Sequence, residues 1–228
     1  MQHLEEIGAL GPWLTCAHMV WVDESDLPLL AERGVGIVHN PSSNLRLRSG
    51  TAPVAQMLAA GIPLGIGLDG HALDDDQDYL REMRLAWTLS NQPGASSPTV
   101  EAARIWQMGT TGGVAITLGS DVPLGRLAAG ALADLVLIDW QAVQGLWSEL
   151  SPVEGLLRRA TRQQVKHVMV NGRWVVWDSC SQTLDEGLIS SALRSELAKP
   201  NLTERQEAAA AYRLATYLRR FYAEWDCM

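Results

Sequence analysis

Two side chains suited to hydrolytic chemistry stand at the ends of short apolar runs in this sequence. His18 closes the run at residues 14–18, and Asp69 follows the run at residues 63–68. A carboxylate can ligate a divalent metal and take a proton from water, and a nearby imidazole can orient that water. Both residues also have simpler interpretations, because a histidine at a strand end is often structural and Asp-Gly often forms only a turn.

The apolar runs predict strands that alternate with helices. The expected strands are residues 14–18, 35–38 and 63–68, and the expected helices end at Gly34 and span residues 52–60. Residues 40–51, rich in Ser, Asn, Pro and Gly, are expected to form an irregular loop. This alternation calls for a parallel sheet, at whose carboxyl edge His18 and Asp69 would face one bowl. Three strands cannot close a barrel of eight strands and about 250 residues. The expected fold class is therefore α/β, the C-terminal part of a (β/α)8 TIM-type barrel.

The second half of the chain predicts a small β module followed by helices. Residues 135–138 form one expected strand, and residues 165–177 form a hairpin that turns on Asn171-Gly172. Asn-Gly between two β-branched runs is a strong hairpin signal. The predicted organisation is barrel strands and helices at 1–120, an appended β module at 121–182 and a helical tail at 183–228.

Composition and charge narrow the class of partner. The 228 residues are 47% hydrophobic and carry a net charge of −8, with a pI near 5.1. A nucleic acid or an anionic membrane would need a basic face, so neither is expected as a partner. The three cysteines form no CxxC motif, no signal peptide is evident, and no apolar run approaches the ~18–20 residues of a membrane span. The sequence predicts a cytoplasmic protein.

Three short motifs occur in a particular order along the chain. They are Ala17-His18, then His39-Asn40-Pro41-Ser42-Ser43-Asn44, then Gly67-Leu68-Asp69-Gly70. Similar segments continue at Glu82-Met83-Arg84, at residues 125–136 and at residues 168–172. Over residues 9–185 the sequence resembles the amidohydrolase superfamily, in its deaminase and chlorohydrolase branch. That branch includes the S-adenosylhomocysteine/methylthioadenosine deaminases, guanine deaminases and triazine hydrolases.

The resemblance implies an activity and a role for each motif residue. Asp69 resembles the metal-ligating aspartate of barrel strand eight, which also takes the proton of the hydrolytic water. His18 resembles the strand-six histidine that contacts this water or, in two-metal relatives, a second metal. The metal would be Zn²⁺ or Fe²⁺, and the activity would be hydrolytic deamination of a heterocyclic amine such as an aminopurine. Triazine-type dechlorination is the alternative within the same fold. The implied substrate contacts are His39, Ser43, Asn44 and His71.

A run of acids after His71 has two interpretations. Asp74, Asp75, Asp76 and Asp78 could contact a cation or the substrate, or they could belong to a solvated loop.

The sequence also departs from the family pattern. It contains no HxH pair, which the family places on barrel strand one, and no strand-five histidine in a matching context. His3 and Glu6 fit H-x-x-E, but they lie only 15 residues before His18 and are interpreted as a coincidence. Asp69 and His18 alone fall short of the three or four protein ligands of a zinc site. The second hypothesis is therefore a non-catalytic fragment or split half, completed by an oligomer or by a complementary N-terminal half.

Overall fold

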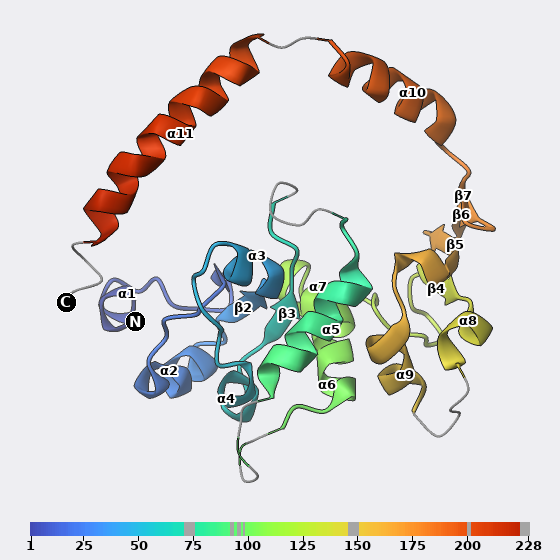
Figure 1. The fold of residues 1–228 in the computed structure, drawn as a ribbon. Coiled ribbons are helices and arrows are strands. Elements are labelled where there is room, and N and C mark those ends of the chain that lie inside the picture. The colour runs from blue at the N-terminus through green and yellow to red at the C-terminus, as the bar shows by residue number, and fades with distance from the viewer. Residues whose placement is uncertain are drawn as a thin grey trace. The chain divides into compact units, whose positions relative to one another are not determined.

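Figure 1 shows the computed structural model, which describes residues 1–70, 76–91, 94, 97, 99–145, 151–199 and 202–223. Internal contacts divide the chain into two compact units, Met1–Gln182 and Thr183–Met228. The tail predicted at 183–228 begins at the same point. The finer boundary between residues 120 and 121 stays a prediction.

A short parallel sheet organises the first half of the chain. Its strands are β1 (Thr15–Ala17), β2 (Gly36–His39) and β3 (Leu64–Ile66), and they lie in the order β1-β2-β3. Cys16 pairs with Ile37, and Ile37 pairs with Leu64. The parallel pairing predicted from the alternating pattern is confirmed.

Helices connect these strands, as a parallel sheet requires. The 3-10 turn η1 (Glu24–Asp26) and α2 (Leu27–Glu32) lie between β1 and β2, and α4 (Val54–Ala59) lies between β2 and β3, whereas α1 (Gln2–Glu6) precedes β1. The core between sheet and helices contains fully buried Leu30, Val35, Ile37, Val54 and Met57. Burial of these apolar side chains is the main stabilisation of this half.

The prediction of an irregular loop at residues 40–51 is wrong for the first half of that segment. Pro41–Arg46 forms helix α3, with Pro41 as its first residue. Proline is favoured there because its fixed φ suits a helix and its missing N–H would have no intrahelical partner. The composition of the segment suggested turns, whereas its polar side chains have partners elsewhere in the fold.

A helical stretch after β3 lies against the sheet. It comprises α5 (Tyr79–Ser90), α6 (Ala102–Gln107), the π-type turn η2 (Met108–Gly112) and α7 (Gly113–Thr117). A Cβ added at Gly36 would lie 2.8 Å from Ile116 Cγ2, and one at Gly65 would lie 3.3 Å from Ile116 Cδ1. Helix α7 can therefore approach β2 and β3 closely because these two strand positions lack side chains.

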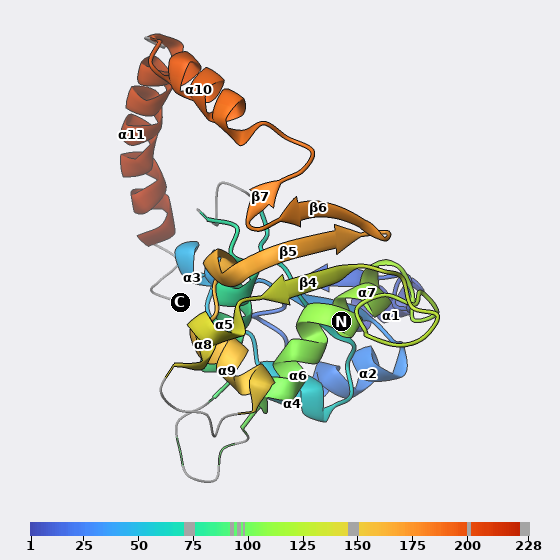
Figure 2. The ribbon, with the colours of Figure 1, turned by 90° about the vertical axis from the view of Figure 1, so that its right-hand side faces the viewer.

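The predicted β module is an antiparallel sheet in the order β4-β5-β6-β7 (Figure 2). Asn171 and Gly172 turn the hairpin with φ values of 48° and 76°, as a tight hairpin of this handedness requires. Arg84 of α5 donates to the carbonyl oxygens of Leu157 and Ala160, at 2.7 and 2.5 Å. These bonds connect α9 and the residue that follows it to α5.

The elements of this region are β4 (Leu135–Ile138), α8 (Trp140–Gln144), α9 (Pro152–Arg159), η3 (Arg162–Gln164), β5 (Val165–Val170), β6 (Arg173–Trp177) and β7 (Cys180–Ser181).

The second unit contains α10 (Glu186–Leu197) and α11 (Leu202–Ala223). Within the described residues, no helix has both the length and the apolar character needed to cross a membrane.

The contact between η2 and β3 gives a direct test of the packing. A methyl added by Gly112→Ala would lie 2.4 Å from the Leu64 carbonyl oxygen, which belongs to a strand and cannot swing away. We expect this variant to lower the free energy of unfolding by about 1–3 kcal/mol in a urea titration followed by circular dichroism.

The adjacent glycine is the matched control. Gly113 is also helical, and the nearest atom to its added Cβ is the Met108 carbonyl oxygen at 3.6 Å. Gly113→Ala should leave stability unchanged or raise it by up to about 1 kcal/mol, since alanine favours a helix. Equal losses in the two variants would contradict the close contact at Gly112.

Candidate active site

The carboxyl ends of the three parallel strands bring four polar side chains together. Ser43 donates through Oγ to Asp69 Oδ2 at 2.5 Å, and His18 Nδ1 lies 2.7 Å from Asn44 Oδ1. His18 Nε2 lies 3.8 Å from Asp69 Oδ2. His18 follows β1, Ser43 and Asn44 lie on α3 after β2, and Asp69 follows β3. His18 and Asp69, the two residues singled out first in the sequence, thus belong to one cluster, and both bond side chains of α3.

The Asn44 contact selects the tautomer of His18. An amide carbonyl oxygen only accepts, so Nδ1 carries a proton and, in the neutral imidazole, the lone pair is on Nε2, the nitrogen on the side of Asp69. An imidazole in this state can ligate a metal or accept a proton from water through Nε2. His18 and Asp69 side chains are 37% and 32% exposed, so solvent reaches both.

Strained backbone is found at the same place. His18, Met19 and Asp69 have φ values of 67°, 45° and 63°, in the left-handed region that L-residues rarely occupy. Such positions cost about 1–3 kcal/mol each and persist only where the surrounding structure enforces them. Both chemically suited side chains are held by strained backbone.

His39 lies inside the fold rather than at its surface. It is 1% exposed, and in the described structure neither ring nitrogen has a hydrogen-bond partner. Burial, and secondarily the charge of His18, lowers the pKa of His39 to about 4. His39 is therefore neutral at pH 7 and packs behind the cluster. Ser43 and Asn44 are also buried and use their oxygens on Asp69 and His18. Direct substrate contact by these three residues stays a prediction.

The predicted acidic loop is only partly described. His71, Asp74 and Asp75 lie outside the described residues. Asp76 forms an ion pair with Arg81. Asp78 is buried, caps α5 through the Arg81 N–H at 3.2 Å, and accepts the Arg162 N–H at 2.9 Å. These two acids have structural partners.

The residues that could hold a metal form an incomplete set. Across the described parts of the chain, no group of three or more His, Cys, Asp and Glu side chains is arranged to hold an ion. Asp69 and His18 fit Zn²⁺ or Fe²⁺ in the chemistry of their donor atoms but not in number. The H-x-x-E candidate adds nothing, because His3 and Glu6 face solvent on α1, 81% and 74% exposed and 3.8 Å apart.

Sequence reasoning missed Glu82 as part of this region. Its carboxylate is 3% exposed and accepts both the backbone N–H and the hydroxyl of Ser42 at 3.0 Å. The available signal was its place in the Glu82-Met83-Arg84 segment, where an acid falls on the buried side of α5 beside Met83 and Ala86.

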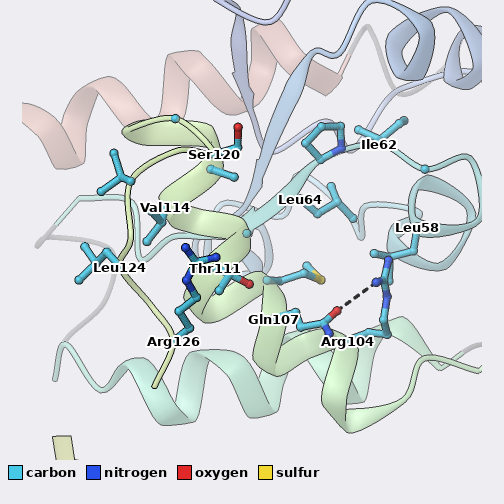
Figure 3. A pocket seen from close by; sticks show the side chains of 17 residues that line it. Leu58, Ile62, Leu64, Arg104, Gln107, Thr111, Val114, Ser120, Leu124 and Arg126 are labelled. Atoms are coloured by element: carbon cyan, nitrogen blue, oxygen red, sulfur yellow. Dashed lines mark hydrogen bonds between the residues drawn. The ribbon is translucent and has the colours of Figure 1, made fainter. Parts of the chain in front are cut away.

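A separate hollow lies at the opposite end of β3. Leu64 is the first residue of that strand, so this cavity of about 440 Å³ is at the amino end, away from Asp69 (Figure 3). In it, Arg104 donates to Gln107 Oε1 at 3.0 Å. Polar and apolar surface contribute about equally to its wall, and the apolar part includes Leu58, Ile62, Met108, Val114 and Leu124.

The geometry of the cluster does not identify the protein family, whereas comparison with known families does. A model described as the amidohydrolase family matches residues 1–175. The chain belongs to the amidohydrolase family. The resemblance drawn from the three ordered motifs is confirmed.

Several curated relatives of this amidohydrolase chain are named as deaminases. It is 42% identical over 193 residues to a 5-methylthioadenosine/S-adenosylhomocysteine deaminase of Natronomonas pharaonis, covering 83% of this chain and 43% of the relative. It is 36% identical over 176 residues to a 5'-deoxyadenosine deaminase of Methanopyrus kandleri, covering 77% and 40%. The chain thus spans less than half the length of these relatives.

Solved structures of two hydrolases match this chain in fold. An adenosine deaminase from Xanthomonas campestris with bound zinc matches with a TM-score of 0.78 and 31% identity, over 85% of this chain and 44% of that one. An atrazine chlorohydrolase from Arthrobacter aurescens complexed with zinc matches with a TM-score of 0.75 and 28% identity, over 85% and 43%. This amidohydrolase chain therefore has the fold of the corresponding part of both.

The buried neutral His39 predicts how the stability of the chain depends on pH. The unfolded chain takes up a proton near pH 6.5, whereas folded His39 does so only near pH 4. Above pH 6.5, His39 does not lower the free energy of unfolding. As pH falls toward 4, the unfolded state gains a proton that folded His39 does not, and the free energy of unfolding decreases by about 3 kcal/mol at most. Urea titrations at pH 7, 5.5 and 4.5 should show a shallower loss for His39→Leu than for the wild type.

His3→Gln serves as the control for this experiment, because His3 lies exposed on α1. It should retain the wild-type pH dependence. A His39→Leu variant with the wild-type slope would mean that other groups cause the loss at low pH.

Proposed function

We propose that this chain is the C-terminal part of a (β/α)8 metal-dependent aminohydrolase that deaminates a heterocyclic amine such as an aminopurine. The observation that carries the proposal is the cluster in which Ser43 holds Asp69 and Asn44 holds His18 at the carboxyl ends of β1 and β3. Catalytic groups of (β/α)8 enzymes lie at this end of the strands. The deaminase relatives at 36–42% identity support the aminopurine class of substrate.

In the proposed reaction, water adds to the ring carbon that bears the amino group, and the carbon–nitrogen bond then breaks to release ammonia. Asp69 accepts the proton of the attacking water and delivers it to the departing amino group. His18, with its Nε2 lone pair directed to the side of Asp69, accepts a hydrogen bond from the water and so orients it.

A Zn²⁺ or Fe²⁺ ion would be held by Asp69, with His18 beside it. When bound, such an ion supplies Lewis acidity that lowers the pKa of a water ligand. The zinc in the two solved relatives supports this cofactor. The remaining donors would come from a complementary N-terminal half.

Completion of the site would require further strands. The outer edge of β3 has no strand beside it in the described sheet, and a cavity with a partly apolar wall lies at the amino end of this strand. Unpaired strand edges and apolar surface of this kind are normally covered. A complementary N-terminal half, carried on the same or another polypeptide, fits this edge better than a homo-oligomer, because it would supply both the missing strands and the missing ligands. If no such half joins the chain, the alternative is a non-catalytic fragment.

The proposal predicts that metal and activity appear together. The chain should be expressed alone and together with the coding sequence that precedes Met1, and then assayed for zinc per chain and for ammonia release from aminopurine nucleosides. Alone, the chain should bind little zinc and release no ammonia. The completed protein should bind zinc and release ammonia. In the completed protein, Asp69→Asn should lower kcat/KM by about 10³-fold or more, since it removes a metal ligand and a proton carrier.

Matched variants sharpen this test. His3→Gln should retain activity within about twofold, because His3 is exposed and lies outside the cluster. Undiminished ammonia release by Asp69→Asn, or a completed protein without zinc or ammonia release, would refute the proposal. Chloride release from a chlorotriazine without deamination would favour the chlorohydrolase alternative.

A further inference from the structure

Helix α3 supports both halves of the cluster but cannot fix its own position. It has six residues, and its N-cap residue Asn40 makes no side-chain capping hydrogen bond. Helices this short are unstable by themselves, and their first N–H groups need partners from outside the helix. The orientation of Ser43 and Asn44 therefore depends on a contact made by some other element.

Glu82 of α5 makes this contact. One carboxylate oxygen accepts the backbone N–H of Ser42, in the first turn of α3, and also accepts the Ser42 hydroxyl, both at 3.0 Å. A carboxylate at this position caps the helix and interacts favourably with its dipole. Because Glu82 is 3% exposed, water is largely excluded from these bonds. Glu82, 40 positions after Ser42 in the sequence, thus replaces the missing local cap.

Helix α5 is itself held firmly on both sides. The Tyr79 hydroxyl donates to the carbonyl oxygen of Ile66, the last residue of β3, at 2.9 Å. Arg84 donates to the Leu157 carbonyl oxygen at 2.7 Å, and the buried Asp78 accepts the Arg162 N–H at 2.9 Å. One turn of α5 thereby links the end of β3, three residues before Asp69, with the start of α3.

We infer that Glu82 is a positioning residue for the active site. By fixing the first turn of α3, it sets Ser43 against Asp69 and Asn44 against His18, and so it controls the orientation of the carboxylate and the tautomer of the imidazole. Glu82 touches neither reacting group. Its importance for catalysis rests on the proposed function, whereas its control of the geometry does not.

The test follows the geometry in the chain itself by NMR. Glu82→Ala removes the acceptor, so exchange of the Ser42 amide should accelerate roughly 10- to 100-fold relative to that of Ile37, whose amide bonds the Pro63 carbonyl oxygen in the sheet. The ¹⁵N signals of the His18 ring should also change from a single tautomer to a mixture. Glu82→Gln keeps an acceptor oxygen and should restore the His18 signals and most of the Ser42 protection.

Two comparisons separate positioning from general stability. Thr88→Ala removes a side-chain bond on the exposed side of α5, to the Arg84 carbonyl oxygen, and should alter neither signal. In the completed enzyme, Glu82→Ala should lower kcat with little change in KM, and Glu82→Gln should recover much of the loss.

The possible results are distinct. Unchanged Ser42 exchange and His18 signals in Glu82→Ala would overturn the inference, and so would a uniform acceleration of all core amides that Glu82→Gln does not reverse. The NMR measurement needs no activity. A completed protein without deaminase activity therefore refutes the proposed function while leaving the positioning role open to its own test.

Discussion

The hydrogen bonds that α3 makes with its two neighbours are the constraint on which the candidate site depends. Ser43 and Asn44 are consecutive residues, yet one bonds Asp69 after β3 and the other bonds His18 after β1. The middle strand of the sheet thus aligns the polar residues that follow its two flanking strands. Parallel strands make this possible because their carboxyl ends lie at one edge. The cluster is a property of the sheet rather than of any one segment.

Much of the fold could be predicted from the sequence, because its signals are local. Apolar runs marked β1, β2 and β3, and Asn171-Gly172 marked the hairpin between β5 and β6. Helix α3 was missed, since Ser, Asn and Pro favour turns locally and the stabilising contact comes from Glu82, about 40 residues further along the chain. Composition cannot reveal such a contact.

The site was predicted in part for the same reason. Strand-end position and motif order drew attention to His18 and Asp69, and the structure brings them within 3.8 Å. The burial of His39 could not be read from its place in the motif, because burial depends on which helices cover the strand. The Glu82-Met83-Arg84 segment resembles the family but assigns no role to Glu82, since that role lies in a tertiary hydrogen bond.

The left-handed backbone at His18 and Asp69 has a consequence for engineering. Glycine or asparagine would occupy these φ values at lower cost, so selection for thermal stability alone would tend to replace both residues. A stabilised variant obtained without an activity screen would thus lose the cluster first, while retaining the sheet and helices around it. Libraries built on this chain should hold both positions constant and seek their gains in other parts of the fold.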